Sequence, residues 1–245
     1  MKVFLSIFLF LLLLPAAQAE QARLAVAANF LATAKALVGV FEKQTGHELL
    51  VSAASTGKLY AQIINDAPYD VFLSADRHHP QLLETAGRVV EGSRFVYATG
   101  RLVLWSSEVI LLDEASLTKG EFKRLAMANP RTAPYGRAAQ LVLKNMGLWQ
   151  RVKAKLVRGE SIAQAFQFVA TGNAQLGLVA LSQVLNPANA HNRQGYWLIP
   201  EDQYEPLQQA AVLLQQGQDN IAAKQFLQFL HSDKAIMIMN RYGYG

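Results

Sequence analysis

The sequence has 245 residues, a formal net charge of +5 and no cysteine, with 51% hydrophobic and 17% charged residues. This composition is typical of a globular chain, and the missing cysteines exclude disulfides, thiol catalysis and thiolate metal sites. The positive charge favours anions and anionic membranes, but it is spread along the chain without a Lys/Arg cluster that contains aromatic residues, so we expect no binding to nucleic acid.

Residues 1–19 have the pattern of a cleavable export signal. Lys2 precedes an apolar run over residues 3–14, and Pro15 and several small residues follow it. An uncleaved membrane anchor is the rival interpretation, but the run is shorter than the roughly 20 apolar residues that span a bilayer. We therefore expect cleavage before Glu20 and a protein that is soluble after export.

The first part of the mature chain alternates between strands and helices. Apolar residues at strand or helical spacing predict a strand at 22–27, a helix at 30–44, a strand at 49–54, a helix at 59–65 and a strand at 70–74. This order is typical of a parallel sheet that is covered by helices on both faces and binds ligands at the carboxyl ends of its strands.

The same alternation returns after a β-rich stretch at 95–105, which we expect to carry the chain from one lobe to another. The elements predicted there and beyond are a strand at 125–128, helices at 137–146 and 161–170, strands at 176–181 and 210–214, and a helix at 220–231. The predicted fold class is α/β, with two lobes that are each a mostly parallel sheet flanked by helices, and a ligand cleft between them. We expect lobe I to contain residues 20–100, lobe II residues 101–200, and residues 201–245 to return to lobe I.

Small polar residues stand at the predicted junctions between strand ends and helix starts. These junctions are Ala28-Asn29, Ser55-Thr56-Gly57 and Pro134-Tyr135-Gly136. A helix start has unpaired N–H groups, which attract an anion. The second junction is not a nucleotide-binding P-loop, because Ser52 replaces the first glycine and Leu59 the hydroxyl residue after the lysine. An ordinary N-cap is the other interpretation of this junction.

Sequence markers in the same order extend from Arg23 to Tyr242. They are Ala27-Ala28-Asn29-Phe30, Ser55-Thr56-Gly57, Asp70-Val71-Phe72-Leu73-Ser74-Ala75-Asp76, Asn129-Pro130 with Ala133-Pro134-Tyr135-Gly136, Gly172-Asn173-Ala174 before Leu176-Gly177, and Arg241-Tyr242-Gly243. On these markers the chain resembles the periplasmic molybdate-binding proteins of ABC transporters, which have the type 2 periplasmic binding protein fold. The resemblance implies a monomeric periplasmic receptor that has no catalytic activity and no cofactor. It also implies that the receptor closes over molybdate or tungstate and delivers it to a permease in the inner membrane.

The resemblance also implies a set of oxyanion-binding residues and no bare metal cation. The implied residues are Ala28, Asn29, Ser55, Thr56, Tyr135 and Val169. Many members of the family have a tyrosine where this chain has Ala180 and a small residue where it has Tyr135, so we expect the hydroxyl of Tyr135 to replace the family tyrosine. None of these groups is cationic, which agrees with a dianion held by neutral donors at helix starts.

Other functions stay open at this point. A receptor of the same fold for sulfate or another tetrahedral oxyanion would need the same donors. A periplasmic enzyme that acts on an anionic substrate is a more distant alternative, because the chain has no Gly-x-Ser-x-Gly or His-Glu-x-x-His motif. Tyr242 and Tyr244 are typical of ferric binders but have no carboxylate or histidine cluster beside them, and the adjacent His78 and His79 fit a loop better than a metal site.

Overall fold

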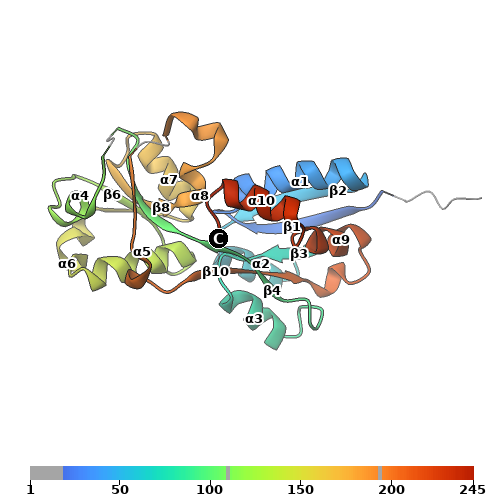
Figure 1. Cartoon of the computed structure of the whole chain (residues 1–245). Helices are drawn as coiled ribbons and strands as arrows, with labels where there is room; N and C mark the ends of the chain where they lie inside the picture. Colours follow the sequence, from blue (N-terminus) through green and yellow to red (C-terminus); the bar gives the residue numbers. More distant parts are fainter. Residues whose placement is uncertain (1–18, 109–110, 193–194) are drawn as a thin grey trace, which may run out of the picture.

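The computed structural model describes residues 19–108, 111–192 and 195–245. Except for Ala19, the predicted export signal lies outside these residues. The described chain forms two five-stranded sheets, in the orders β2-β1-β3-β10-β4 and β7-β6-β8-β5-β9. Helices flank both sheets (Figure 1). We call the first sheet with its helices lobe I and the second sheet with its helices lobe II.

Lobe I contains both ends of the described chain. Its elements are β1 (Gln21–Ala27), α1 (Leu31–Thr45), β2 (Glu48–Ala54), α2 (Thr56–Ile64), β3 (Val71–Leu73), α3 (His78–Thr85), β4 (Phe95–Gly100), β10 (Leu207–Leu213), η4 (Gln215–Gly217), α9 (Ile221–Phe229) and α10 (Asp233–Arg241). Strands β1, β2 and β3 are parallel, whereas β10 is antiparallel to β3 and β4. Phe30, Phe41 and Phe226 belong to the core on the face of α1, α9 and α10, and Leu59 and Leu83 to the core beneath α2 and α3.

Lobe II repeats this plan. Its elements are β5 (Leu102–Trp105), α4 (Glu114–Thr118), β6 (Leu125–Ala128), α5 (Pro134–Asn145), α6 (Trp149–Val152), η1 (Lys153–Lys155), β7 (Leu156–Gly159), α7 (Ile162–Ala170), β8 (Leu176–Ala180), α8 (Leu181–Val184), η2 (Pro187–Asn192) and β9 (Tyr196–Leu198), followed by η3 (Glu201–Gln203). Strands β6, β7 and β8 are parallel, and β5 is antiparallel to β8 and β9. All four residues of β6 are buried, as expected for a strand covered on both faces.

The structure confirms the predicted two-lobed α/β architecture and corrects several details. The β-rich stretch at 95–105 divides at Arg101 into β4 and β5, which belong to different sheets. Each sheet has only three mutually paired parallel strands, because β10 and β5, which follow the crossings between the lobes, pair antiparallel with β3 and β8. Helix α5 begins at Pro134 rather than residue 137, since proline suits a first helical turn. Helix α10 was not predicted.

The described residues include no helix with the length and apolar character that crossing a bilayer requires.

Candidate anion-binding site

A small pocket lies between the lobes, where parallel strands of both sheets end. The volume open to a water molecule is about 10 Å³, within about 200 Å³ of space between atoms that includes open solvent. The residues that line it are Ala27, Ala28, Asn29, Ser55, Thr56, Ala75, Ala133, Pro134, Tyr135 and Ile162. They follow the carboxyl ends of β1, β2, β3, β6 and β7, which is where α/β sheets bind ligands. None of these side chains carries a charge.

Two hydroxyl groups belong to the pocket at the start of α2. Ser55 is 3% exposed, and its Oγ atom has no hydrogen-bond partner among the described residues. It occupies the N-cap position of α2, yet its side chain makes no capping hydrogen bond. The Oγ atom of Thr56 accepts a hydrogen bond from the Ala75 N–H at 3.1 Å, so the hydroxyl hydrogen of Thr56 stays available. The ordinary N-cap interpretation therefore fails for Ser55, and both hydroxyls can donate to an anion.

Backbone N–H groups supply further donors. Helices α2, α5 and α7 all begin at the pocket, so the partial positive charge of each helix start lies beside it. Among the described residues, no hydrogen bond engages the N–H groups of Asn29, Thr56, Tyr135 or Ile162. The N–H of Ile162 is available because the Ser161 side chain accepts its hydrogen bond from the N–H of Gln164 instead. The pocket thus presents neutral hydrogen-bond donors, and its lining contains no carboxylate or histidine that could accept a proton from a ligand.

The structure changes the roles expected for the first junction. The side-chain Nδ2 of Asn29 donates to Gln209 Oε1 at 2.9 Å and to the Tyr244 hydroxyl at 3.1 Å, so both amide hydrogens are already used. The Ala28 N–H donates to the Ala54 carbonyl at 2.9 Å. Asn29 therefore offers its backbone N–H rather than its side chain, and Ala28 forms part of the wall.

The side chain of Tyr135 contacts residues outside the pocket lining. Its buried hydroxyl accepts a 3.5 Å hydrogen bond from Gln209 Nε2 and lies so close to Gly100 that a Cβ atom at that position would overlap it. Burial holds the pKa of Tyr135 well above its usual value. Neither Gly100 nor Gln209 lines the pocket. The hydroxyl of Tyr135 therefore has Gln209 as its partner, while no hydrogen bond of the described residues engages the backbone N–H of Tyr135. That the hydroxyl replaces the family tyrosine absent at Ala180 stays a prediction.

The structure does not bring Val169 to the pocket. It lies near the carboxyl end of α7, packed in the core of lobe II with Trp105 and Phe166, and its carbonyl accepts a hydrogen bond from Ser107 Oγ at 3.0 Å. Ile162, at the opposite end of α7, lines the pocket instead, roughly 10 Å away along the helix axis. The sequence signal for Ile162 is the N-cap residue Ser161 two positions after Gly159, the last residue of β7.

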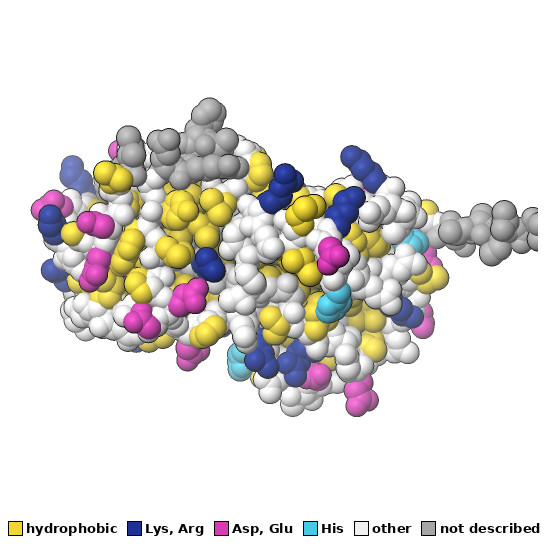
Figure 2. Space-filling view, viewed as in Figure 1, with side chains coloured by type: hydrophobic (Ala, Val, Ile, Leu, Met, Phe, Trp, Pro, Cys, Tyr) yellow, Lys and Arg dark blue, Asp and Glu magenta, His cyan; other side chains and the backbone are white. Residues whose placement is uncertain are grey.

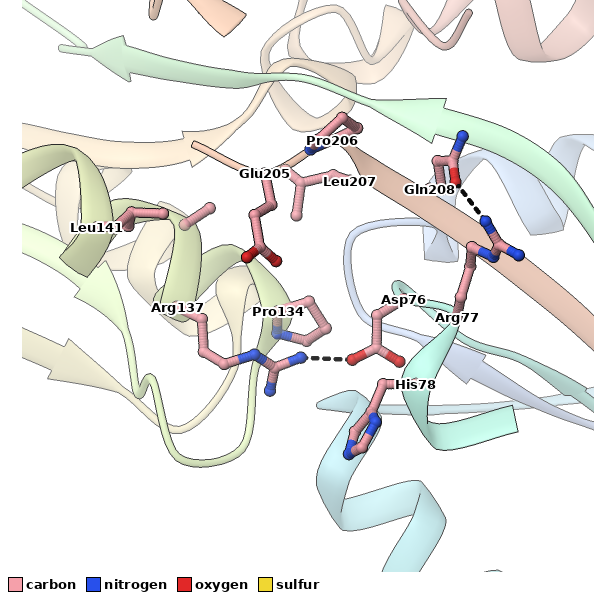
Figure 3. A pocket seen from close by; sticks show the side chains of 11 residues that line it. Asp76, Arg77, His78, Pro134, Arg137, Leu141, Glu205, Pro206, Leu207 and Gln208 are labelled. Carbon is pink, nitrogen blue, oxygen red and sulfur yellow. Dashed lines mark hydrogen bonds and ion pairs between the residues drawn. The ribbon is translucent and has the colours of Figure 1, made fainter. Parts of the chain in front are cut away.

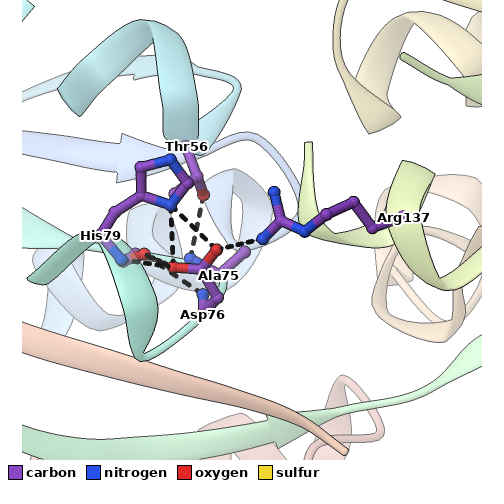
Figure 4. A network of polar contacts seen from close by, with 6 residues as sticks. Thr56, Ala75, Asp76, His79 and Arg137 are labelled. Atoms are coloured by element: carbon purple, nitrogen blue, oxygen red, sulfur yellow. Dashed lines mark hydrogen bonds and ion pairs between the residues drawn. The ribbon is translucent and has the colours of Figure 1, made fainter. Parts of the chain in front are cut away.

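Beside the pocket, Asp76 is the centre of a polar network (Figure 4). Its carboxylate accepts hydrogen bonds from His79 Nδ1 at 2.9 Å, from Ser74 Oγ at 3.1 Å and from Arg137 Nη2 at 2.5 Å. Burial opposes the charge, but His79 and Arg137 outweigh it and lower the pKa of Asp76 to about 2. Within the described residues, Asp76 and His79 belong to no group of three or more side chains of the types that hold metals.

Direct contacts join the lobes around the pocket. Arg137 of α5 pairs with Asp76 of lobe I, and Lys58 pairs with Glu160 of lobe II at 3.0 Å. The Gly57 N–H donates to the Thr132 carbonyl at 2.9 Å across the same boundary. The lobes are therefore closed over the pocket.

A larger cleft adjoins the pocket on the outer side of Asp76 and Arg137 (Figure 3). Its lining includes Arg77, His78 and Glu205, and thus side chains of both charge signs. On the face in Figure 2, basic and acidic side chains are likewise interspersed over both lobes. A dianion is better matched by the small pocket, where no carboxylate repels it.

Comparison with known proteins confirms the resemblance seen in the sequence. A family model described as bacterial extracellular solute-binding protein matches residues 22–245. The chain is 51% identical over 236 residues to the molybdate-binding protein ModA of Azotobacter vinelandii, which covers 96% of this chain and 93% of that protein. It is 42% identical over 234 residues to the molybdate-binding protein ModA of Rhodobacter capsulatus, with 95% of this chain and 91% of that protein covered.

A solved structure supports the same relationship. The periplasmic molybdate-binding protein of Azotobacter vinelandii superimposes with a TM-score of 0.86 at 38% identity and covers 91% of this chain and 98% of that one. The chain therefore belongs to the bacterial extracellular solute-binding proteins and, within them, to the ModA family of molybdate-binding proteins.

Proposed function

We propose that this protein is a receptor that binds molybdate in the pocket between its lobes and delivers it to an ABC import permease. The observation that carries the proposal is the Ser55 hydroxyl, which is buried without a hydrogen-bond partner among other free donors. A buried polar group without a partner costs about 1–3 kcal/mol, and an oxyanion between the lobes would satisfy it. The relatives at 51% and 42% identity are both named molybdate-binding proteins.

The chemistry of the donors selects the kind of anion. The hydroxyls of Ser55 and Thr56 and the free N–H groups donate hydrogen bonds, and the pocket lining offers no carboxylate that would accept a proton from the ligand. Such a site suits an anion that is fully deprotonated at neutral pH, as molybdate is. Helix starts stabilise its double charge without a basic side chain. Tungstate has nearly the same size and charge, so it is a second ligand of the same site.

Binding is the whole activity in this proposal. The named relatives are binding proteins rather than enzymes, and neither a histidine nor a carboxylate lines the pocket to activate the two hydroxyls. The receptor acts as a monomer in the periplasm after removal of residues 1–19, and its closed form presents both lobes to the permease. Neither a cofactor nor a resident metal ion takes part.

Calorimetric titration of the ligand-stripped chain from Glu20 onward tests the proposal. Molybdate, tungstate, sulfate and phosphate are titrated in parallel at the same pH and ionic strength. We expect tight one-to-one binding of molybdate and tungstate and no heat from phosphate, which carries a proton that the pocket has no group to accept. Binding of sulfate alone would make the protein a sulfate receptor, and the absence of heat from all four anions would refute oxyanion binding.

A further inference from the structure

The segment from Tyr242 to Gly245 lies between the two lobes, where Figure 1 marks the end of the chain. Gly245 pairs with Thr99 of β4 through two backbone hydrogen bonds, of 2.7 and 3.1 Å. Gly243 has a φ of +80°, and a Cβ atom there would lie 2.8 Å from side-chain carbons of Leu181 and Leu185 in lobe II. The segment therefore contacts lobe I through its backbone and lobe II through close packing.

Tyr244 connects the lobes through a ring of three hydrogen bonds. Asn29 Nδ2 donates to the Tyr244 hydroxyl at 3.1 Å, and Ser182 Oγ donates to the Asn29 carbonyl at 3.0 Å. The single hydrogen of the Tyr244 hydroxyl has two acceptors at 3.0 Å, Ser182 Oγ and the Asn29 carbonyl, and donation to Ser182 closes the ring. Each hydrogen is used once in this arrangement, so the ring closes without an unsatisfied donor. All three side chains are buried. Hydrogen bonds in such a closed, buried ring strengthen one another.

The ring joins a residue of the anion pocket to the opposite lobe. Asn29 belongs to lobe I and offers its backbone N–H to the pocket, while Ser182 belongs to α8 of lobe II. The second amide hydrogen of Asn29 is bonded to Gln209, so both its side chain and its carbonyl are held. The hydrogen bonds of Ser182 to Tyr244 and to the Asn29 carbonyl cross the boundary between the lobes.

The hydroxyl of Tyr244 keeps its proton under ordinary conditions. Burial raises the pKa of Tyr244 to about 12, against smaller opposing effects of its hydrogen bonds to Ser182 and Asn29. The hydroxyl can therefore donate to Ser182 throughout the neutral range. This environment of neutral groups also differs from a ferric site, in which a tyrosine loses its proton to bind the metal.

We propose that Tyr244 is a positioning residue for anion binding: its hydroxyl fixes Asn29 at the pocket and ties lobe I to Ser182 of lobe II in the closed form. The proposal rests on the proposed function, because it concerns affinity for the anion bound between the lobes. Tyr244 does not line the pocket and acts through Asn29 and the closure of the lobes. The ring stabilises the closed, ligand-bound form, so its main effect is on release of the anion.

Tyr244→Phe tests this role, because it removes one hydroxyl and keeps the aromatic ring. This ring packs edge-on against that of Phe30, with 5.2 Å between the ring centroids. We expect the molybdate dissociation constant to rise about 2- to 12-fold, which corresponds to one neutral hydrogen bond. Stopped-flow measurements should assign this change to a faster dissociation rate at an unchanged association rate. Tyr242→Phe is the matched control, since no side-chain hydrogen bond of the described residues engages that hydroxyl, and its constants should equal those of the wild type.

Ser182→Ala breaks the same ring from lobe II and allows a double-mutant cycle. If the ring acts as a unit, the double variant should bind about as well as either single variant, whereas independent effects would add. A Tyr244→Phe variant with a lower melting temperature but wild-type rates of binding and release would make Tyr244 a purely structural residue and overturn the proposal. If this variant does not fold, wild-type molybdate affinity in Ser182→Ala overturns it equally. Failure of the wild type to bind molybdate would instead refute the proposed function.

Discussion

Replacing Ser55 with alanine separates the stability of the protein from its affinity for the anion. The Oγ atom of Ser55 is buried and has no hydrogen-bond partner among the described residues, so its removal should leave the free energy of unfolding, measured without added anion, unchanged or higher. In the proposed complex we expect the same atom to donate to a charged ligand, and a hydrogen bond of that kind contributes about 1.5–3 kcal/mol. We therefore expect the dissociation constant for molybdate to rise about 10- to 150-fold.

Ser232→Ala is the matched control, because Ser232 also occupies a helix N-cap position. Its side chain accepts a hydrogen bond from the Ala235 N–H and thereby caps α10, so its loss should lower stability by about 1 kcal/mol without changing affinity. Urea unfolding of the ligand-free proteins and calorimetric titration with molybdate measure the two quantities. Unchanged affinity in Ser55→Ala, or a loss of stability as large as that of Ser232→Ala, would refute the assignment of Ser55 as a ligand donor.

Three further predictions address a backbone donor, the crossing between the lobes and the response to acid. Ile162→Pro removes the N–H at the first position of α7, a position that tolerates proline. This variant should weaken molybdate binding by about 1.5–3 kcal/mol in calorimetry. Ile162→Val keeps the N–H and should bind molybdate more tightly than the proline variant. Gly100→Ala places a Cβ atom against the Tyr135 hydroxyl and should cost about 1–3 kcal/mol of stability in urea unfolding; a wild-type midpoint would contradict this packing. The pKa of Asp76 is lowered from 3.8 to about 2, so its ionised form should contribute about 2 kcal/mol of stability above pH 4. This contribution is lost as the pH falls towards 2. Asp76→Asn should abolish that part of the acid transition, and an unaltered dependence of stability on pH in this variant would contradict the prediction.

The alternation of apolar strands and helices was enough to predict the two-lobed α/β fold, because strands such as β3, β6 and β8 are buried on both faces and the longer helices each bury one apolar face. The starts of helices were less accurate. Helix α2 begins at Thr56 and α5 at Pro134, both earlier than the apolar spacing indicates, because α2 begins with Thr56 and Gly57 and α5 with Pro134, residues that do not continue the apolar pattern. Helix α10 was missed, although Ser232 is an ordinary N-cap signal.

The candidate site could be predicted where it depends on local chain geometry. Ser55 and Thr56 lie at the pocket because a strand end leads directly into a helix start. The role of the Asn29 side chain could not be predicted in this way, because its partners Gln209 and Tyr244 are distant in sequence and meet it only in the folded protein. Tyr135 illustrates the same limit, since the direction of its side chain depends on the space left by Gly100.

The most direct test of molybdate binding in this pocket is a crystal structure of the molybdate complex with anomalous diffraction data that locate the metal. We predict one strong anomalous peak between the lobes, with ligand oxygens within hydrogen-bonding distance of the Ser55 and Thr56 hydroxyls and of the N–H groups of Tyr135 and Ile162. A peak in the outer cleft beside Arg77 and Glu205, or no ordered peak in a crystal grown with excess molybdate, would contradict the assignment of this pocket as the molybdate site.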